Sequence, residues 1–219
     1  MYLRKPKPKE RFAAYSHYVA LIVSIVGSIF LIYLSRMNRG ILITTIVYTI
    51  CLNFMFGSSA VYHTYKKEDN EISFWRKVDH VAIYCMIAGT YTAVSYLYTD
   101  GNFRWTIIAF QWGFAIVGSV FKIFKVEIPV WIDVSIYLVM GWMIIIRVDY
   151  MFKEFPLRVI LLVLFGGIAY TIGAILHAIN KKKPFPGVFE FHDIFHVLII
   201  VGAALHYAVI LDAVVKLGV

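Results

Sequence analysis

The chain has 219 residues, of which 61% are hydrophobic and 16% charged, and its formal net charge is +8. A soluble domain is about half apolar and about a quarter charged, so this composition excludes an ordinary soluble protein. The apolar residues form long blocks between short polar segments, which is typical of a single-domain polytopic membrane protein. The basic residues gather between these blocks as orientation signals, so we expect no nucleic acid partner.

Seven apolar blocks predict an all-α fold with seven transmembrane helices. A basic segment of residues 1–12 precedes them and is expected in the cytoplasm. The predicted helices span residues 13–35, 41–63, 78–98, 103–121, 128–146, 157–179 and 189–215. Each is long enough to cross about 30 Å of hydrocarbon at about 1.5 Å per residue. The first block is too long for a signal peptide, so we expect it to be retained as a helix.

The connecting segments predict the orientation of the chain. With the N-terminus inside, twice as many lysines and arginines fall on the cytoplasmic side as outside. This bias favours a cytoplasmic N-terminus and an external C-terminus, in a multi-pass protein of the cell membrane. Residues 184–187, Pro-Phe-Pro-Gly, predict a rigid connector before the last helix. The two cysteines, Cys51 and Cys85, lie inside apolar blocks and are interpreted as small buried hydrophobes, neither a disulfide nor metal ligands.

In this topology six of the seven histidines share the cytoplasmic end, and only His206 lies deeper. His192 and His196 are four residues apart, on one face of the last helix. His63 ends the second helix. An open catalytic zinc site takes three imidazoles and a water molecule, so these three residues predict a metal site if the second and last helices are adjacent.

Two further polar residues accompany this predicted site. Ser59 lies one turn before His63 on the same face, and Asp79 lies on the third helix at matching depth. A carboxylate there can accept a proton from a metal-bound water or orient a ligand. Ser59 and Asp79 are therefore candidate catalytic residues.

The remaining polar residues have simpler interpretations. His17, His80 and His177 are expected to be interfacial hydrogen-bonding residues, and His206 a packed residue that bonds a neighbouring helix. The segment from Glu10 to His17 stays ambiguous: it either caps and orients the first helix or closes over the site.

Three motifs carry a resemblance across the whole chain. They are Ser59–His63 (SAVYH), Asp79–His80 leading to Ala88–Thr92 (AGTYT), and His192-x-x-x-His196 followed by Gly202–Tyr207 (GAALHY). In this order they resemble the bacterial hemolysin III branch of the progestin and adipoQ receptors, which include the adiponectin receptors.

The resemblance implies seven helices and a zinc ion near the cytoplasmic face. Its zinc ligands correspond to His63, His192 and His196, its aspartate on the zinc-bound water to Asp79, and its serine to Ser59. The superfamily looks like membrane hydrolases of lipid amides such as ceramide, and bacterial members are tied to haemolysis and membrane-lipid homeostasis. One departure is that relatives often carry an asparagine where this chain has Ala13 and Ala14.

Three functions follow as hypotheses. The first is a zinc-dependent hydrolase of a lipid amide or ester, with membrane lipids as substrate. The second is a non-enzymatic sensing or signalling protein in which zinc is structural. The third, a haemolytic pore former, ranks last because no amphipathic insertion segment is evident. Nitrogen ligation fits zinc best but leaves iron, cobalt and nickel open.

Overall fold

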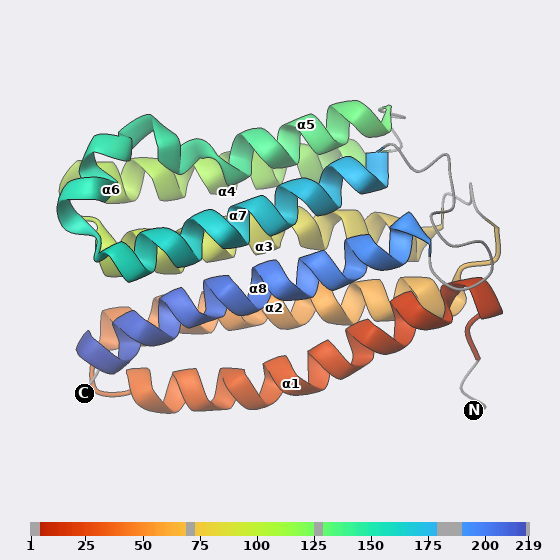
Figure 1. Cartoon of the computed structure of the whole chain (residues 1–219), viewed down its shortest axis with the longest axis horizontal. Helices are drawn as coiled ribbons and strands as arrows, with labels where there is room; N and C mark the ends of the chain where they lie inside the picture. The colour runs from red at the N-terminus through yellow and green to blue at the C-terminus, as the bar shows by residue number, and fades with distance from the viewer. Residues whose placement is uncertain (1–4, 69–72, 125–128, 179–189, 218–219) are drawn as a thin grey trace.

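The fold is a bundle of long helices, described by a computed structural model for residues 5–68, 73–124, 129–178 and 190–217 (Figure 1). Seven segments of these residues are long and apolar enough to cross a membrane. This confirms the predicted all-α polytopic fold. The helices are η1 (Pro8–Glu10), α1 (Arg11–Ser35), α2 (Arg39–Tyr65), α3 (Phe74–Tyr98), α4 (Gly101–Ile123), α5 (Val130–Gly141), η2 (Met143–Arg147), α6 (Val148–Glu154), α7 (Leu157–Ala178) and α8 (Phe191–Leu217).

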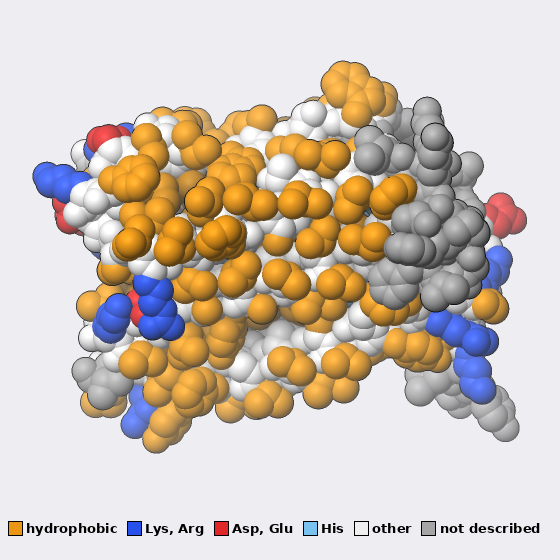
Figure 2. Space-filling model, viewed as in Figure 1, with side chains coloured by type: hydrophobic (Ala, Val, Ile, Leu, Met, Phe, Trp, Pro, Cys, Tyr) orange, Lys and Arg blue, Asp and Glu red, His pale blue; other side chains and the backbone are white. Residues whose placement is uncertain are grey.

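The surface of the bundle is that of a membrane protein. Hydrophobic side chains cover the middle of the visible face, and lysine, arginine and acidic side chains lie towards its two ends (Figure 2). The first and last described residues lie at opposite ends of the bundle (Figure 1). The chain is therefore a multi-pass membrane protein, as predicted. We call the end where α1 begins the site end.

Helix α1 shows how such a bundle packs. Its buried face is small or polar, whereas its outer face carries large apolar side chains such as Val23, Val26 and Ile29. Small residues let neighbouring backbones approach, and lipid accepts the large ones. Asn53 of α2 ties the two helices together, because its amide donates to Ser28 Oγ at 2.9 Å and accepts from Ser24 Oγ at 2.7 Å.

The fifth membrane segment differs from its prediction. We expected one helix over 128–146, followed by residues of mixed polarity. Instead α5 ends at Gly141 and the segment continues through η2 and α6 to Glu154. The break is tolerated because other helices satisfy the freed backbone groups. The Tyr91 hydroxyl donates to Gly141 O at 2.8 Å and accepts from Ile144 N at 2.9 Å, and Gln111 Nε2 donates to Met140 O at 2.8 Å.

Two of the helices that begin at the site end, α1 and α3, start earlier than predicted. Helix α1 begins at Arg11, directly after η1, and α3 begins at Phe74 with the Ser73 hydroxyl capping Arg76 N. The basic segment of residues 1–12 therefore contains helical residues, and Glu10 among them is buried. The predicted connector over 184–187 lies outside the described residues.

Helix α3 is the centre of the bundle, since its apolar window is the most buried of the seven, at 67%. It packs against α2, α4, α5 and α8. Helix α8 in turn contacts α1, α3 and α7, so the last helix closes the bundle beside the first (Figure 1). This arrangement brings the start of α8 near the end of α2, where the histidines lie.

Close packing of α2 on α3 depends on Gly89, and we predict that Gly89→Ala destabilises the protein. A Cβ at this position would lie 2.8 Å from both Cβ and Sγ of Cys51, one of two free cysteines. Cβ is fixed to the backbone and cannot rotate away, so overpacking should cost about 1–3 kcal/mol. Thermal unfolding in detergent checks this, with Gly113→Ala as the control.

Gly113 is also helical, but an added Cβ there meets no atom within 4 Å. Its replacement should leave the melting temperature unchanged or raise it slightly, because alanine favours helix over glycine. Equal melting temperatures for the two variants would show that the α2–α3 contact tolerates the extra methyl group.

Candidate metal centre

Three histidine side chains converge at the site end of the bundle. His63 comes from the last turn of α2, and His192 and His196 come from the first two turns of α8. Their ring centroids lie 5.0 Å (63–192), 4.7 Å (63–196) and 4.6 Å (192–196) apart. One possible ligand atom from each lies within 4.8 Å of the others, so the group is compact enough for one metal ion. The predicted convergence of His63 with the α8 pair is confirmed.

The hydrogen-bond geometry indicates which nitrogens face each other. His63 Nδ1 is 2.7 Å from Glu10 Oε2, which leaves Nε2 as the nitrogen available to a metal. His196 Nε2 lies 3.1 Å from His192 Nε2. Two nitrogens bound to one tetrahedral ion at about 2.0–2.1 Å stand about 3.3 Å apart, so the α8 pair is close to ligand spacing. Three convergent neutral imidazoles fit zinc as a donor set.

The site is shielded from solvent. His63 is 2% exposed and His196 is 1% exposed, whereas His192 is partly exposed. Burial of three imidazoles side by side is costly unless their polar nitrogens are satisfied. A bound cation would satisfy all three facing nitrogens at once.

Ser59 and Asp79 lie beside the histidines, as predicted. Ser59 is buried on α2, one turn before His63, and its side chain lies close enough to interact with the Asp79 carboxyl group on α3. Asp79 also interacts electrostatically with His63. Helices α2, α3 and α8 thus each contribute to one cluster of polar side chains.

Two residues of the segment that the sequence left ambiguous also reach the candidate metal centre. Glu10 contacts His63, and His17 Nε2 lies 2.9 Å from His196 Nδ1. The ambiguous segment from Glu10 to His17 therefore belongs to the site. Ala13 and Ala14, where relatives often have asparagine, are fully buried and leave both contacts in place. The sequence pattern that could have placed Glu10 and His17 at the site is their seven-residue spacing with Ser24. This spacing puts all three residues on one buried face.

His177 lies next to the three converging histidines, whereas His206 lies away from them. The His177 ring on α7 lies 5.6 Å from the His192 ring and 4.9 Å from that of Phe195. His206 bonds the carbonyl of Val163 on α7 at 3.4 Å, which confirms its predicted role in helix packing.

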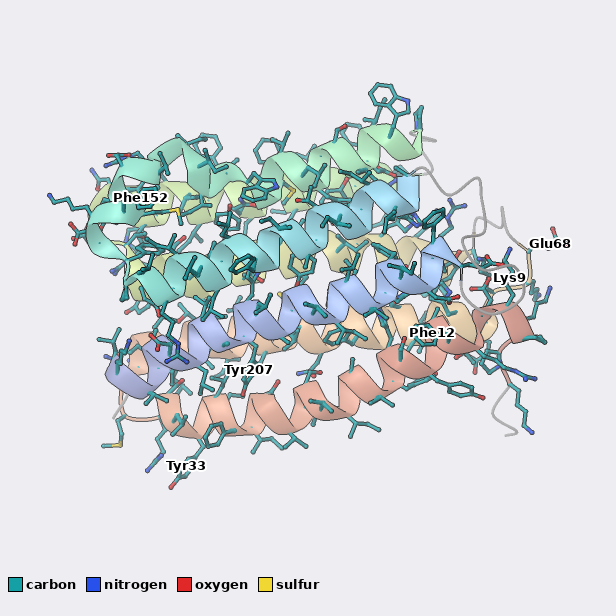
Figure 3. The ribbon with its side chains drawn as sticks, viewed as in Figure 1. Lys9, Phe12, Tyr33, Glu68, Phe152 and Tyr207 are labelled. Carbon is teal, nitrogen blue, oxygen red and sulfur yellow. The ribbon has the colours of Figure 1, made fainter. Side chains whose placement is uncertain are left out.

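A hollow of about 340 Å³ lies just outside the site end, near the labelled side chains of Lys9 and Glu68 (Figure 3). It is lined by Lys7, Lys9, Glu10, Lys66, Lys67 and Glu68. Its lining is mostly basic, and it includes the same Glu10 that contacts His63. The polar surface of the protein therefore meets the metal centre at this carboxylate.

Known proteins resemble this chain along nearly its whole length. The profile of the family described as "Haemolysin-III related" matches residues 6–207. The "Hemolysin-3 homolog" of Bacillus subtilis (strain 168) is 32% identical over 214 residues, covering 95% of this chain and 96% of the relative. The "Hemolysin-3" of Bacillus cereus is 32% identical over 206 residues, covering 93% and 91%.

Proposed function

The chain belongs to the Haemolysin-III related family, and from that premise we propose that it is a zinc-dependent hydrolase of a lipid amide or ester. The observation that carries the proposal is the convergence of three imidazoles, with a serine and a carboxyl group close beside them. Three protein ligands leave one position of a tetrahedral ion open, which distinguishes catalytic zinc sites from structural ones. The proposed process is membrane-lipid homeostasis in the cell membrane, with the N-terminus in the cytoplasm.

His63, His192 and His196 would hold the ion. When bound, such an ion supplies Lewis acidity, which polarises a carbonyl group and acidifies a water molecule. The protein must then provide a base for the proton and a fixed position for the substrate.

Asp79 is the proposed general base. Its carboxylate accepts the proton of the attacking water and returns it to the leaving amine or alcohol. Ser59 lies close to this carboxyl group. Its hydroxyl has one proton, so it can donate either to an ionised Asp79 or to a developing oxyanion, but not to both at once.

The proposed substrate is a lipid because of where the site lies. The histidines belong to the ends of helices long and apolar enough to span a membrane. We expect these ends to lie at the level where a headgroup linkage meets its acyl chain. Large apolar side chains cover the outside of the bundle, so an acyl chain can approach in the bilayer. An amide or ester bond near the headgroup then reaches the site without leaving the membrane.

The decisive test is turnover by the purified protein. Zinc-loaded protein in mixed micelles should release fatty acid from at least one member of a panel of ceramides, acyl amides and phospholipid esters, followed by mass spectrometry. Chelation of the metal should stop release, and readdition should restore it. Release that persists after the metal is removed would contradict the mechanism.

Two other functions predict different results for the same purified protein. A sensing protein with structural zinc would hydrolyse no lipid, but would lose thermal stability on chelation. A lytic protein, as the names of the Bacillus relatives suggest, would raise the conductance of planar bilayers. The group holds three histidines among the described residues; an ion bound by three side chains would keep a position for water, which favours the hydrolase over a structural metal.

A further inference from the structure

Two buried polar residues near the start of the first helix have no part in the proposed chemistry: Glu10, the last residue of η1 and the N-cap of α1, and His17 within α1. Glu10 is 3% exposed and His17 is 2% exposed. They are seven residues apart, which is about two helical turns and one face. An acidic group and an imidazole at such depth are costly unless their hydrogen bonds serve the structure or a ligand.

Glu10 fixes the His63 ring through a carboxylate that is itself held at both oxygens. Oε2 lies 2.7 Å from His63 Nδ1, and Oε1 accepts a hydrogen bond from Lys66 Nζ at 2.7 Å. An ionised carboxylate only accepts, so His63 must carry its proton on Nδ1. The Nε2 lone pair is then directed at the other histidines. The carboxylate also raises the basicity of this nitrogen as a ligand.

His17 fixes the His196 ring in the same way that Glu10 fixes the His63 ring. His196 Nδ1 lies 2.9 Å from His17 Nε2, and His196 Nε2 lies 3.1 Å from His192 Nε2. When His196 Nε2 binds a metal its proton is on Nδ1, so it donates to His17 Nε2. His17 is then protonated at Nδ1, a buried nitrogen with no hydrogen-bond partner among the described residues. The rings of His17 and Phe56 pack edge to face, with their centroids 5.4 Å apart.

We propose that Glu10 and His17 are positioning residues that fix the tautomers of His63 and His196, so that α1 completes the metal centre. The proposal rests on the metal site of the proposed function and extends it to a fourth helix. Each of two ligands, one on α2 and one on α8, has a partner from the same face of α1. Loss of such a partner commonly weakens metal binding about 10–100-fold.

The test measures metal affinity in the full-length protein. Metal-free protein in detergent is titrated with Zn²⁺ against a chromophoric chelator, and the Co²⁺-loaded form gives a ligand-field spectrum. Glu10→Gln keeps an acceptor oxygen but loses the charge, and His17→Phe keeps a ring but loses the acceptor. Both variants should bind Zn²⁺ about 10–100-fold more weakly than the original protein and shift the Co²⁺ bands.

Two further variants separate positioning from folding. Ser24→Ala removes a buried polar group from the same face of α1, where it bonds Asn53 and not a histidine, so the affinity should stay unchanged. His17→Gln restores an acceptor for His196 and should recover part of the affinity that His17→Phe loses. Thermal unfolding of the metal-free forms shows whether any variant is merely misfolded.

The possible results distinguish this proposal from the metal site itself. If the original protein binds no metal, the proposed metal site and the positioning roles of Glu10 and His17 are both wrong. If it binds one Zn²⁺ and Glu10→Gln and His17→Phe bind it within twofold as tightly, the metal site stands and the positioning roles are wrong. An equal loss in Ser24→Ala and His17→Phe would likewise overturn the proposal, because it would trace the effect to α1 packing.

Discussion

The His63→Ala variant is expected to be purified without its metal ion. His63 supplies the α2 ligand of the site, whereas the other two ligands both belong to α8. The free energy of Zn²⁺ binding to structural sites with four ligands is about 10–16 kcal/mol, or roughly 3 kcal/mol per ligand. Removing one ligand should therefore weaken zinc binding by about a hundredfold or more. Elemental analysis of the purified protein should fall from about one zinc per chain to less than about a tenth.

The matched control is His206→Ala. His206 is a half-buried α8 histidine about 15 Å along the helix from His196, and it bonds Val163 O. Its loss should change the stability of the α7–α8 contact and leave the zinc content near one. Full zinc content in His63→Ala would show that the ion, if any, is held elsewhere.

The seven helices could be predicted because the bilayer imposes one rule on the sequence. Each crossing needs about 20 apolar residues, so length and composition suffice for their existence and order. The break after Gly141 could not be predicted in this way. It depends on the Tyr91 hydroxyl and the Gln111 amide, which come from α3 and α4 and satisfy backbone groups that a lone helix would leave exposed to lipid.

The three histidines of the candidate metal centre could be predicted because all three lie at one end of the bundle and all three offer an imidazole nitrogen. His192 and His196 are neighbours on any helix, and His63 joins them once the helices alternate in direction. The sequence left Glu10 with two alternatives, to cap the first helix or to close over the site, and did not identify it as the partner of His63. Its role depends on which carboxylate oxygen meets which nitrogen, and that is a property of packed helices.

The second large effect concerns the proposed base. Once a hydrolysed lipid has been identified, Asp79→Asn should lower kcat about 10²–10⁴-fold while the zinc content stays near one per chain. An amide cannot accept the proton of the attacking water at neutral pH, and general base catalysis contributes about that factor. Asparagine keeps the size of the side chain and an acceptor for the Ser59 hydroxyl, so the helices should pack as before. The measurements are fatty acid release and elemental analysis of the same sample.

Asp212→Asn is the matched carboxyl-to-amide control for this experiment. Asp212 lies on α8 about 30 Å from His192, where it pairs with Lys216 at 2.7 Å. The kcat of Asp212→Asn should be unchanged. This result would show that the lower kcat of Asp79→Asn comes from the change at the site. If Asp79→Asn retained more than about a third of kcat with its metal in place, Asp79 would not be the base. The proton would then have to pass to another group, and the Ser59–Asp79 pair would serve only to hold α2 against α3.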